Sequence, residues 1–382
     1  MNGYESSQPA PLPRTLLSRL PHPVVQAPMA GGASTPALAA AVSSAGGLGF
    51  LAAGYRSAEA LREEIALTRT LTDAPFGVNV FTPGRPDPHA AQAAARYRDE
   101  LAGEAERYGV ELPPVPDWDD DAYQDKLDVL AETGVQLVSF TFGCPDPDVV
   151  ARLQSAGTEI AVTVTTPEEG VTALRAGADI LVVQGPEAGG HRGSFEPLGV
   201  ADTGPGLLEL LPAVRKAVEE DGARMPMLAS GGVMDGAGLA AVLAAGAAAA
   251  QLGTAFLAAH ESGAHPLHKA ALTDPRWTEH GAFGSSTTVT TAFSGRAARG
   301  LVNRFVAEHG AVAPPSCYPL VHHLVAPLRR AAAARQDPDG MALWAGTGHR
   351  LARAMSAGDL VELLVTELGE ASDTPYRHRS AT

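Results

Sequence analysis

The sequence predicts an α/β protein, a (β/α)8 TIM barrel with an additional, smaller helical domain. Eight short apolar segments recur before residue 253, and segments with helical spacing separate them. Strands that alternate with helices are typical of a parallel sheet, and eight such units close a barrel. Several helical segments end in Ala-Gly or Thr-Gly, and glycine is the common residue just after a helix.

Each predicted strand is a short apolar run, as expected for a strand buried on both faces. In chain order, the strands are predicted at residues 24–27, 49–52, 76–80, 137–141, 160–164, 180–184, 227–229 and 249–252. The apolar spacing between them predicts helices at residues 35–45, 58–71, 122–133, 149–156, 167–176, 207–220 and 236–245. The barrel is therefore expected over residues 15–260.

Two regions interrupt this alternation. Residues 83–118 are polar, charged and rich in proline, with a helical middle at 90–108, and are predicted to be an insertion after the third strand. No strand is predicted beyond Ala258, so residues 261–345 are expected to form the helical domain over one end of the barrel. An amphipathic segment at 347–370 predicts a long helix, so residues 346–372 should return to the barrel before a frayed tail.

Composition and charge argue against several classes of protein. With 382 residues, of which 45% are hydrophobic, the chain can bury a large core. The net charge of −15 argues against nucleic acid, because phosphate backbones bind basic surfaces. Cys144 and Cys317 are too far apart in sequence for a Cys-x-x-Cys metal or redox pair. No signal segment or membrane-spanning run is recognisable, so a cytoplasmic protein that binds neither membrane nor metal is expected.

A glycine-rich loop follows the sixth strand, with the sequence Gln-Gly-Pro-Glu-Ala-Gly-Gly-His-Arg-Gly-Ser-Phe at residues 184–195. Gly189 and Gly190 allow backbone N–H groups to approach a ligand closely. His191 is the side chain of this loop whose unperturbed pKa lies near neutral pH, and barrel enzymes carry their active residues in the loops after strands. We predict that His191 is catalytic; a histidine that only binds backbone is the alternative.

Two further glycine turns follow the seventh and eighth strands. They contain Gly231 and Gly232, and Gly253 and Thr254. Barrels commonly bind phosphate at these two loops, through backbone N–H groups and the positive end of a helix. The chain lacks the Gly-x-Gly-x-x-Gly motif of a Rossmann fold. The pair of turns predicts a phosphate site, and ordinary tight turns are the alternative.

Amide side chains end three of the predicted strands, where a buried apolar residue is usual. They are Asn79, Gln184 and Gln251. An amide offers both a donor and an acceptor, and three together fit the edge of a flat heterocycle such as an isoalloxazine ring. The alternative is that each amide only satisfies loose backbone groups.

Seven segments of the chain resemble the nitronate monooxygenases, formerly called 2-nitropropane dioxygenases. The matching residues, which follow the family's order, are Gln-Ala-Pro-Met-Ala-Gly-Gly at 26–32, Phe-Gly-Val-Asn-Val-Phe at 76–81, Ser-Phe-Thr-Phe-Gly at 139–143, the loop at 184–195, Ser-Gly-Gly-Val at 230–233, Gln-Leu-Gly-Thr-Ala-Phe-Leu at 251–257 and Phe-Ser-Gly-Arg-Ala-Ala-Arg-Gly at 293–300. Together they extend from about residue 23 to residue 305.

The resemblance implies an FMN-dependent enzyme that oxidises alkyl nitronates with O2 to a carbonyl compound and nitrite, and it leaves the use of neutral nitroalkanes open. It implies that FMN is held by the residues matching Ala27, Pro28, Met29, Asn79, Gln184, Gly189, Gly232, Gln251, Gly253 and Thr254, with Gly190 and Gly231 completing the glycine turns. The histidine matching His191 lies over the flavin and removes the α-proton of a neutral nitroalkane. A neutral imidazole suits that role, and a protonated His191 is the alternative partner for a nitronate anion.

The last matching segment contains Ser294 and Arg296, which we expect to contact the substrate; a solvated or internally paired arginine is the alternative. Residues 293–299 fit either a lid over the site or a homodimer surface. The insertion at 83–118 and residues 312–335, which include His322 and His323, match no family motif. The substrate pocket is expected to differ from the family pattern there.

Three other functions remain open from the sequence. FMN-dependent enoyl-ACP reductases share the barrel and an Ala-Gly-Gly-His loop but use NAD(P)H, and the continuation of the loop at 192–195 favours the nitronate family. Barrels similar to IMP dehydrogenase need a nucleophilic cysteine, whereas Cys144 and Cys317 are expected to be structural. A non-catalytic flavin-binding module needs no base at the position of His191. The expected partners are therefore a small-molecule substrate and O2.

Overall fold

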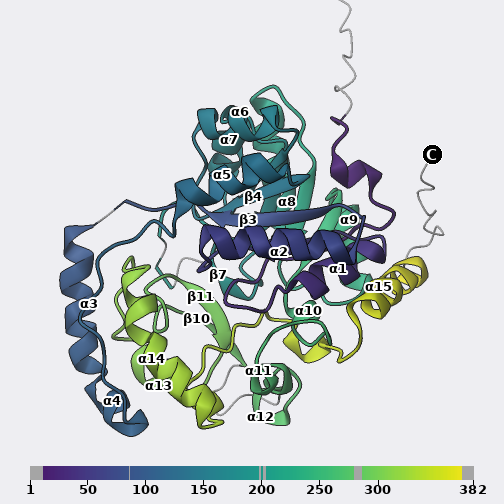
Figure 1. The fold of residues 1–382 in the computed structure, drawn as a ribbon. Helices are drawn as coiled ribbons and strands as arrows, with labels where there is room; N and C mark the ends of the chain where they lie inside the picture. Colours follow the sequence, from purple (N-terminus) through teal and green to yellow (C-terminus); the bar gives the residue numbers. More distant parts are fainter. Residues whose placement is uncertain (1–11, 86, 198, 201–203, 279–285, 372–382) are drawn as a thin grey trace, which may run out of the picture.

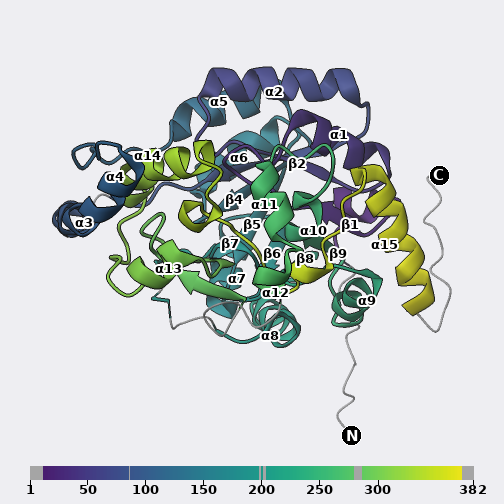
Figure 2. The same ribbon diagram turned by 90° about the horizontal axis from the view of Figure 1, so that it is seen from below.

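The computed structural model describes residues 12–85, 87–197, 199–200, 204–278 and 286–371. Eight parallel strands form its central sheet (Figures 1 and 2), in the order β1-β9-β8-β6-β5-β4-β3-β2. They are β1 (Val24–Gln26), β2 (Gly49–Ala52), β3 (Phe76–Phe81), β4 (Leu137–Thr141), β5 (Glu159–Val164), β6 (Ile180–Gln184), β8 (Met227–Ser230) and β9 (Ala249–Leu252). A parallel bridge between Val25 and Leu48 brings the two ends of the sheet together. The predicted TIM barrel is therefore confirmed.

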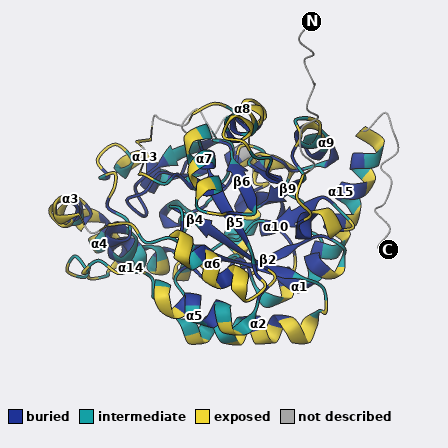
Figure 3. Cartoon of the chain, turned by 90° about the horizontal axis from the view of Figure 1, so that it is seen from above, coloured by how far each residue is buried: buried dark blue, intermediate teal, exposed yellow. Residues whose placement is uncertain are grey.

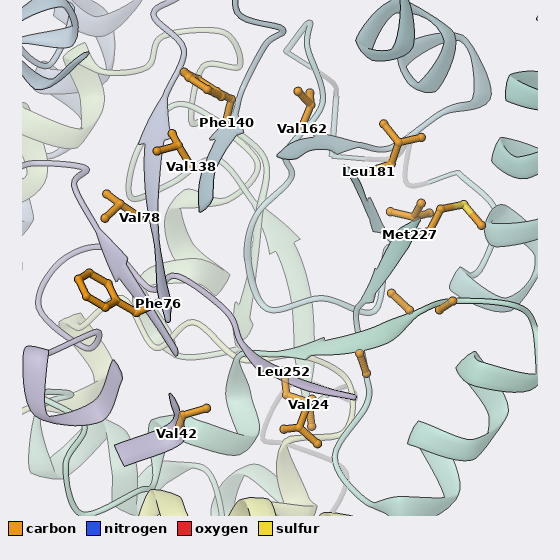
Figure 4. Close-up of a cluster of buried hydrophobic side chains, with 14 of the residues drawn as sticks. Val24, Val42, Phe76, Val78, Val138, Phe140, Val162, Leu181, Met227 and Leu252 are labelled. Atoms are coloured by element: carbon orange, nitrogen blue, oxygen red, sulfur yellow. The ribbon is translucent and has the colours of Figure 1, made fainter. Parts of the chain in front are cut away.

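Alternate residues of the barrel strands face opposite sides, as the pleat of a strand requires. Phe76, Val78, Val138 and Phe140 belong to the large hydrophobic cluster between strands and helices (Figure 4). The intervening positions fill the barrel interior with a smaller cluster that includes Val25, Leu48, Phe50, Leu137, Ala161, Ile180, Val182 and Leu228. Gly77 leaves room for Phe50, since a Cβ at position 77 would lie 2.4 Å from the phenyl ring.

Helices cover the outside of the barrel, and their outer faces carry exposed residues (Figure 3). They are α1 (Pro36–Ser44), α2 (Ala58–Leu71), α5 (Tyr123–Thr133), α6 (Pro147–Ser155), α7 (Pro167–Arg175), α8 (Leu207–Glu220) and α9 (Gly236–Ala244). The side chains of Thr35, Ser57, Thr166 and Asp235 each cap a helix by accepting a backbone N–H. All seven helices predicted between the strands are thus present.

The segment after β3 contains two helices, α3 (Pro88–Glu100) and α4 (Ala102–Tyr108), where the sequence predicts one helical stretch. Both contact α14 (Leu320–Ala334), beside the barrel (Figure 1). A second hydrophobic cluster joins these helices to α10 (Thr254–Leu257), α11 (Pro266–Ala271), α12 (Pro275–Thr278) and α13 (Arg304–His309). Short 3-10 turns lie at η1 (Leu16–Arg19), η2 (Pro338–Gly340) and η3 (His349–Leu351).

The expectation that no strand follows Ala258 is wrong. β10 (Thr287–Thr290) and β11 (Ala298–Leu301) form an antiparallel pair, and β11 also pairs with β7 (Gly190–His191) in the loop after β6. Arginine and glycine occupy the middle of β11, so the segment carries little strand propensity of its own. Its pairing with the distant β7 makes it a strand. The division into domains at residues 260 and 345 stays a prediction.

The terminal helix begins later than the sequence predicts. α15 (Ala357–Ala371) contacts α1 and α9 on the outside of the barrel. The residues before it form a turn at 347–348 and the short η3 helix. Gly346 N–H donates to Thr254 Oγ1 and Thr347 N–H donates to Glu187 O, both at 3.0 Å, and these bonds tie the segment to the barrel. The tail at 372–382 lies outside the described residues. Within the described ranges, no helix combines the length and the apolar character needed to cross a membrane.

Candidate active site

The carboxyl ends of the barrel strands open into a cavity of about 370 Å³, within the ~300–1,000 Å³ usual for small-molecule sites. Polar side chains from six strands line it: Asn79, Ser139, Thr141, Thr163, Gln184, Ser230 and Gln251. The regions outside the barrel strands add Tyr55, His265, His268, His322, Arg329 and Trp344 to its walls. The cavity therefore lies where barrels carry their active sites.

Every residue predicted to hold the cofactor lines this cavity, together with His191. The set is Ala27, Pro28, Met29, Asn79, Gln184, Gly189, Gly190, Gly231, Gly232, Gln251, Gly253 and Thr254. These residues come from five separate loops and strand ends, and the barrel topology brings them to one place. Their contact with a cofactor stays a prediction.

Asn79 and Gln251 are both nearly buried but differ in their partners. The amide nitrogen of Asn79 donates to Ser139 O at 3.1 Å, to Ser139 Oγ at 2.9 Å and to Thr141 Oγ1 at 3.0 Å. The Gln251 side chain forms no hydrogen bond with another described residue, although it is only 5% exposed. Gln251 therefore offers both ends of its amide to the cavity.

The two glycine turns present unused backbone donors. Gly231 and Gly232 have φ angles of 134° and 70°, which side chains other than glycine rarely adopt. The N–H groups of these two glycines, and those of Gly253 and Thr254, donate to no other described residue. Open N–H groups at a glycine turn are the donors that bind phosphate.

Residues 345–348 pack closely against the glycine loop that carries His191. A Cβ at Gly189 would lie 2.5 Å from the backbone nitrogen of Gly346. A Cβ at Gly346 would in turn lie 2.7 Å from Glu187 O. Both glycines are therefore required by the close approach of two backbones, and Gly346 and Gly348 themselves line the cavity.

His191 is fixed by contacts to its backbone and its ring. Its backbone pairs with Ala298 of β11, and its carbonyl accepts from the Gln184 amide at 3.1 Å. Gln184 also accepts from the Gly193 N–H at 2.8 Å. This amide therefore bonds to the backbone of the loop, which agrees with the alternative that it satisfies loose backbone groups. The ring atom Nε2 lies 2.8 Å from Ser294 Oγ.

Aromatic rings surround the imidazole. The ring centroids of Phe142, Tyr318 and Trp344 lie 5.8, 5.8 and 5.5 Å from that of His191. This burial is the main reason that the pKa of His191 falls to about 3, and two nearby arginines add to the effect. The imidazole is therefore neutral at physiological pH, which disfavours the protonated form considered from the sequence.

The nitronate monooxygenase family model matches residues 14–367. The chain belongs to the nitronate monooxygenase family. The nitronate monooxygenase of Pseudomonas aeruginosa is 43% identical over 364 residues, which cover 93% of this chain and 98% of that protein. The resemblance found in seven sequence segments is thus confirmed across the chain. The protein is an enzyme of this family, whose members depend in general on a flavin.

Two solved structures add to this comparison. The crystal structure of nitroalkane oxidase from Streptomyces ansochromogenes is 54% identical, with a TM-score of 0.86, and the match covers 93% of this chain and 98% of that one. FabK from Thermotoga maritima is 27% identical, with a TM-score of 0.68, and the match covers 93% and 94%. Both barrels share the architecture, and the first is much more similar in sequence.

In this member of the family, Ser294 and Arg296 support the site and are not among the residues that line the cavity. Arg296 is 6% exposed; its guanidinium donates to Arg192 O and Ser194 O and lies 4.2 Å from the centroid of the Phe142 ring. The internally paired alternative therefore describes Arg296. Its predicted contact with an anionic substrate group stays a prediction.

The sequence gives little sign of several cavity residues. Tyr55, His265, His268 and Arg329 occur in segments without a recognisable motif, and only folding brings them to the cavity. The Gly-Thr-Gly sequence at 346–348 is a visible signal, because paired glycines permit close backbone approach. Because a long helix is predicted over the same residues, this glycine pair is not recognised as part of the site.

Proposed function

We propose that this chain is an FMN-dependent nitronate monooxygenase that oxidises alkyl nitronates with O2 to a carbonyl compound and nitrite. One observation carries the proposal: His191 and all the predicted FMN-binding residues line the same cavity. The family match supports the same activity. A small-molecule substrate and O2 are the partners this reaction requires.

The residues of the cavity fit FMN. The open N–H groups of Gly231, Gly232, Gly253 and Thr254 suit its phosphate. The unbonded amide of Gln251 suits the polar edge of a flat ring system. No aspartate or glutamate occurs among the described residues that line the cavity, which favours an anionic ligand. Bound FMN would supply the electron-transfer chemistry.

The protein's own residues must bind the substrate, orient its α-carbon and accept a proton where one is released. The Ser294 hydroxyl donates to Arg296 O at 3.2 Å, and it therefore accepts from Nε2–H of His191. This arrangement leaves Nδ1 of His191 as the proton acceptor for a neutral nitroalkane.

The low pKa of His191 favours the nitronate as substrate. A general base works best when its pKa lies near the working pH, and a pKa of about 3 makes the imidazole a weak base. A nitronate has already lost its α-proton, so it needs orientation and charge compensation but no base. The site therefore suits the anion better than the neutral nitroalkane.

The test is a visible spectrum of the purified protein, followed by anaerobic titration with ethyl nitronate. We expect a flavin spectrum that bleaches on titration and release of nitrite once air is admitted. A protein that takes up no FMN would overturn the proposal. Rapid bleaching by NAD(P)H, with no response to ethyl nitronate, would favour the enoyl-ACP reductase alternative instead.

A further inference from the structure

Arg329 is the sole lysine or arginine among the described residues that line the cavity. The whole chain carries a net charge of −15, yet the same described lining includes no aspartate or glutamate. The cavity thus differs in charge from the rest of the protein. A single cation in a wall without acids favours an anionic ligand.

The guanidinium of Arg329 forms its hydrogen bonds to the described part of the protein through one nitrogen only. Its Nη2 donates to His322 O at 3.0 Å and lies 3.4 Å from His322 Nδ1. Its Nε is buried and has no hydrogen-bond partner among the described residues, so it is not open to a ligand. Nη1 forms no hydrogen bond with a described residue and is not buried, so Nη1 is the group that is free toward the cavity. Burial lowers the pKa of Arg329 from that of a free arginine, and no carboxylate is among the groups that shift it. An arginine stays charged even so.

Even a partly buried charge such as that of Arg329 is costly without a counter-ion unless a ligand compensates it. Arginine presents N–H donors in a planar fork that matches two oxygens bound to one atom. A nitronate carries its negative charge on two such oxygens of the NO2 group. The free side of Arg329 therefore matches the substrate in charge and in shape.

The cavity wall beside Arg329 is formed by packed, uncharged aromatic side chains. The ring of Tyr55 stacks on that of His322, with centroids 4.0 Å apart and an angle of 6° between the planes, and Tyr55 Oη lies 3.1 Å from Tyr318 Oη. Burial raises the pKa of Tyr55 to about 12 and lowers that of His322 to about 2. Neither side chain neutralises the guanidinium or shares its charge at physiological pH.

Arg329 also lies near enough to His191 for its charge to lower the pKa of that imidazole. His191 is neutral and so leaves the charge of a nitronate uncompensated. We infer that Arg329 is the charge-selecting residue of the substrate site, and that it favours the nitronate anion over the neutral nitroalkane. This inference rests on the proposed function, and it assigns the selection to a residue outside the segments that resemble the family.

The first test measures anion binding without turnover. Nitrate is a planar anion with the same oxygen geometry as the nitronate group, and its affinity for the holoenzyme is measured by isothermal titration calorimetry at constant ionic strength. We expect R329M to raise the Kd for nitrate about tenfold or more, because a hydrogen bond to a charged group is lost. R329K should lie between R329M and the wild type.

Arg330 provides a matched control. It is the next residue of α14, is exposed, and does not line the cavity, so R330M removes the same charge outside the site. The kinetic test compares ethyl nitronate with nitroethane. In R329M the KM for ethyl nitronate should rise about tenfold, with little change for nitroethane, and R330M should resemble the wild type.

An unchanged nitrate Kd in R329M, or an equal loss in R330M, would overturn the inference. Loss of FMN from R329M with retention by R329K would also overturn it, because Arg329 would then serve the cofactor. If R329M does not fold, R329Q keeps hydrogen-bond donors without the charge and gives the same comparison. A wild type that binds nitrate through Arg329 but does not oxidise ethyl nitronate would instead refute the proposed function.

Discussion

The Nε2 atom of His191 lies 2.8 Å from the Oγ atom of Ser294. The two residues come from distant parts of the chain, and the pairing of His191 with Ala298 in the small sheet brings their segments together. The Ser294 hydroxyl also lies 3.2 Å from Arg296 O, and donation to that carbonyl would leave the hydroxyl to accept from the imidazole. The small sheet thus sets the position of the predicted base beside Ser294.

Replacing Ser294 by alanine should lower kcat/KM for neutral nitroalkanes more than kcat/KM for nitronates. We expect S294A to lower kcat/KM for nitroethane by about tenfold, because a hydrogen bond worth ~1 kcal/mol or more orients the base. The loss for ethyl nitronate should be smaller, since no proton has to be removed. Steady-state kinetics with both substrates measure the difference.

Ser194→Ala is the matched control for that variant. Ser194 is as buried as Ser294, but its hydroxyl donates to Glu196 O at 2.6 Å and not to His191. S194A should therefore affect both substrates alike. Equal losses for the two substrates in S294A would show that Ser294 acts through the fold rather than through His191.

Gly189→Ala should weaken cofactor binding. The new Cβ would lie 2.5 Å from the Gly346 nitrogen, so the two backbones must separate, at a cost of ~1–3 kcal/mol. Residues 345–348 would then move away from the glycine turns. We expect the Kd for FMN to rise about tenfold, which is measured as loss of flavin absorbance on dialysis.

Gly199→Ala serves as the control for G189A. Gly199 lies further along the same loop, and a Cβ there would meet no atom within 4 Å. G199A should keep its flavin. If G189A also retains full flavin occupancy, residues 345–348 do not support the cofactor site.

The sequence was sufficient for the barrel and for most of the cavity lining. Local apolar spacing specifies the strands and helices of the barrel, and a βα unit fixes where its loop must lie. Asn79, Gly231 and Gln251 could therefore be placed at one end of the barrel before their contacts were known. His191 was found in the same way, from a glycine loop after a strand.

Features that depend on distant contacts could not be predicted in this way. β11 is a strand because it pairs with β7, which is far away in sequence. No local sequence pattern predicts this strand. Arg296 and Arg329 look alike in the sequence, but tertiary packing gives Arg296 three internal contacts and Arg329 a place in the cavity. Charge in the sequence alone therefore could not separate the two environments, and the substrate contact expected of Arg296 stays a prediction.

His268 should make the protein less stable in acid. Burial lowers its pKa to about 4, although its Nε2 lies 2.9 Å from Trp344 O. As the pH falls below ~6.5, His268 becomes protonated in the unfolded chain but stays neutral in the folded state. Stability is therefore lost between about pH 6.5 and 4. The loss is at most ~1.4 kcal/mol per pH unit.

His268→Gln keeps a donor for Trp344 O but removes the titrating group. In urea unfolding at a series of pH values, H268Q should lose less stability than the wild type between about pH 6.5 and 4. The difference should vanish above ~pH 7, where both side chains are neutral. Parallel pH profiles for the two proteins would rule out this role for His268.

Replacing Asp121 should destabilise the protein more than replacing its partner Lys126. Lys126 is 0% exposed, and its Nζ lies 2.7 Å from Asp121 Oδ2; Asp121 Oδ1 accepts the N–H of Tyr55 at 3.0 Å. D121N should cost ~3–5 kcal/mol of unfolding free energy, because it leaves a buried ammonium without its partner. K126M should cost less, because it leaves no fully buried charge and the side chain of Asp121 is 22% exposed.

The double variant decides whether the buried charge is the cause. Adding K126M to D121N removes the unpaired ammonium, so the double variant should be more stable than D121N alone in urea unfolding. Its Tyr55 N–H keeps an acceptor, because asparagine retains an amide oxygen. If D121N and the double variant were equally unstable, the unpaired ammonium of Lys126 would not be the cause of the loss.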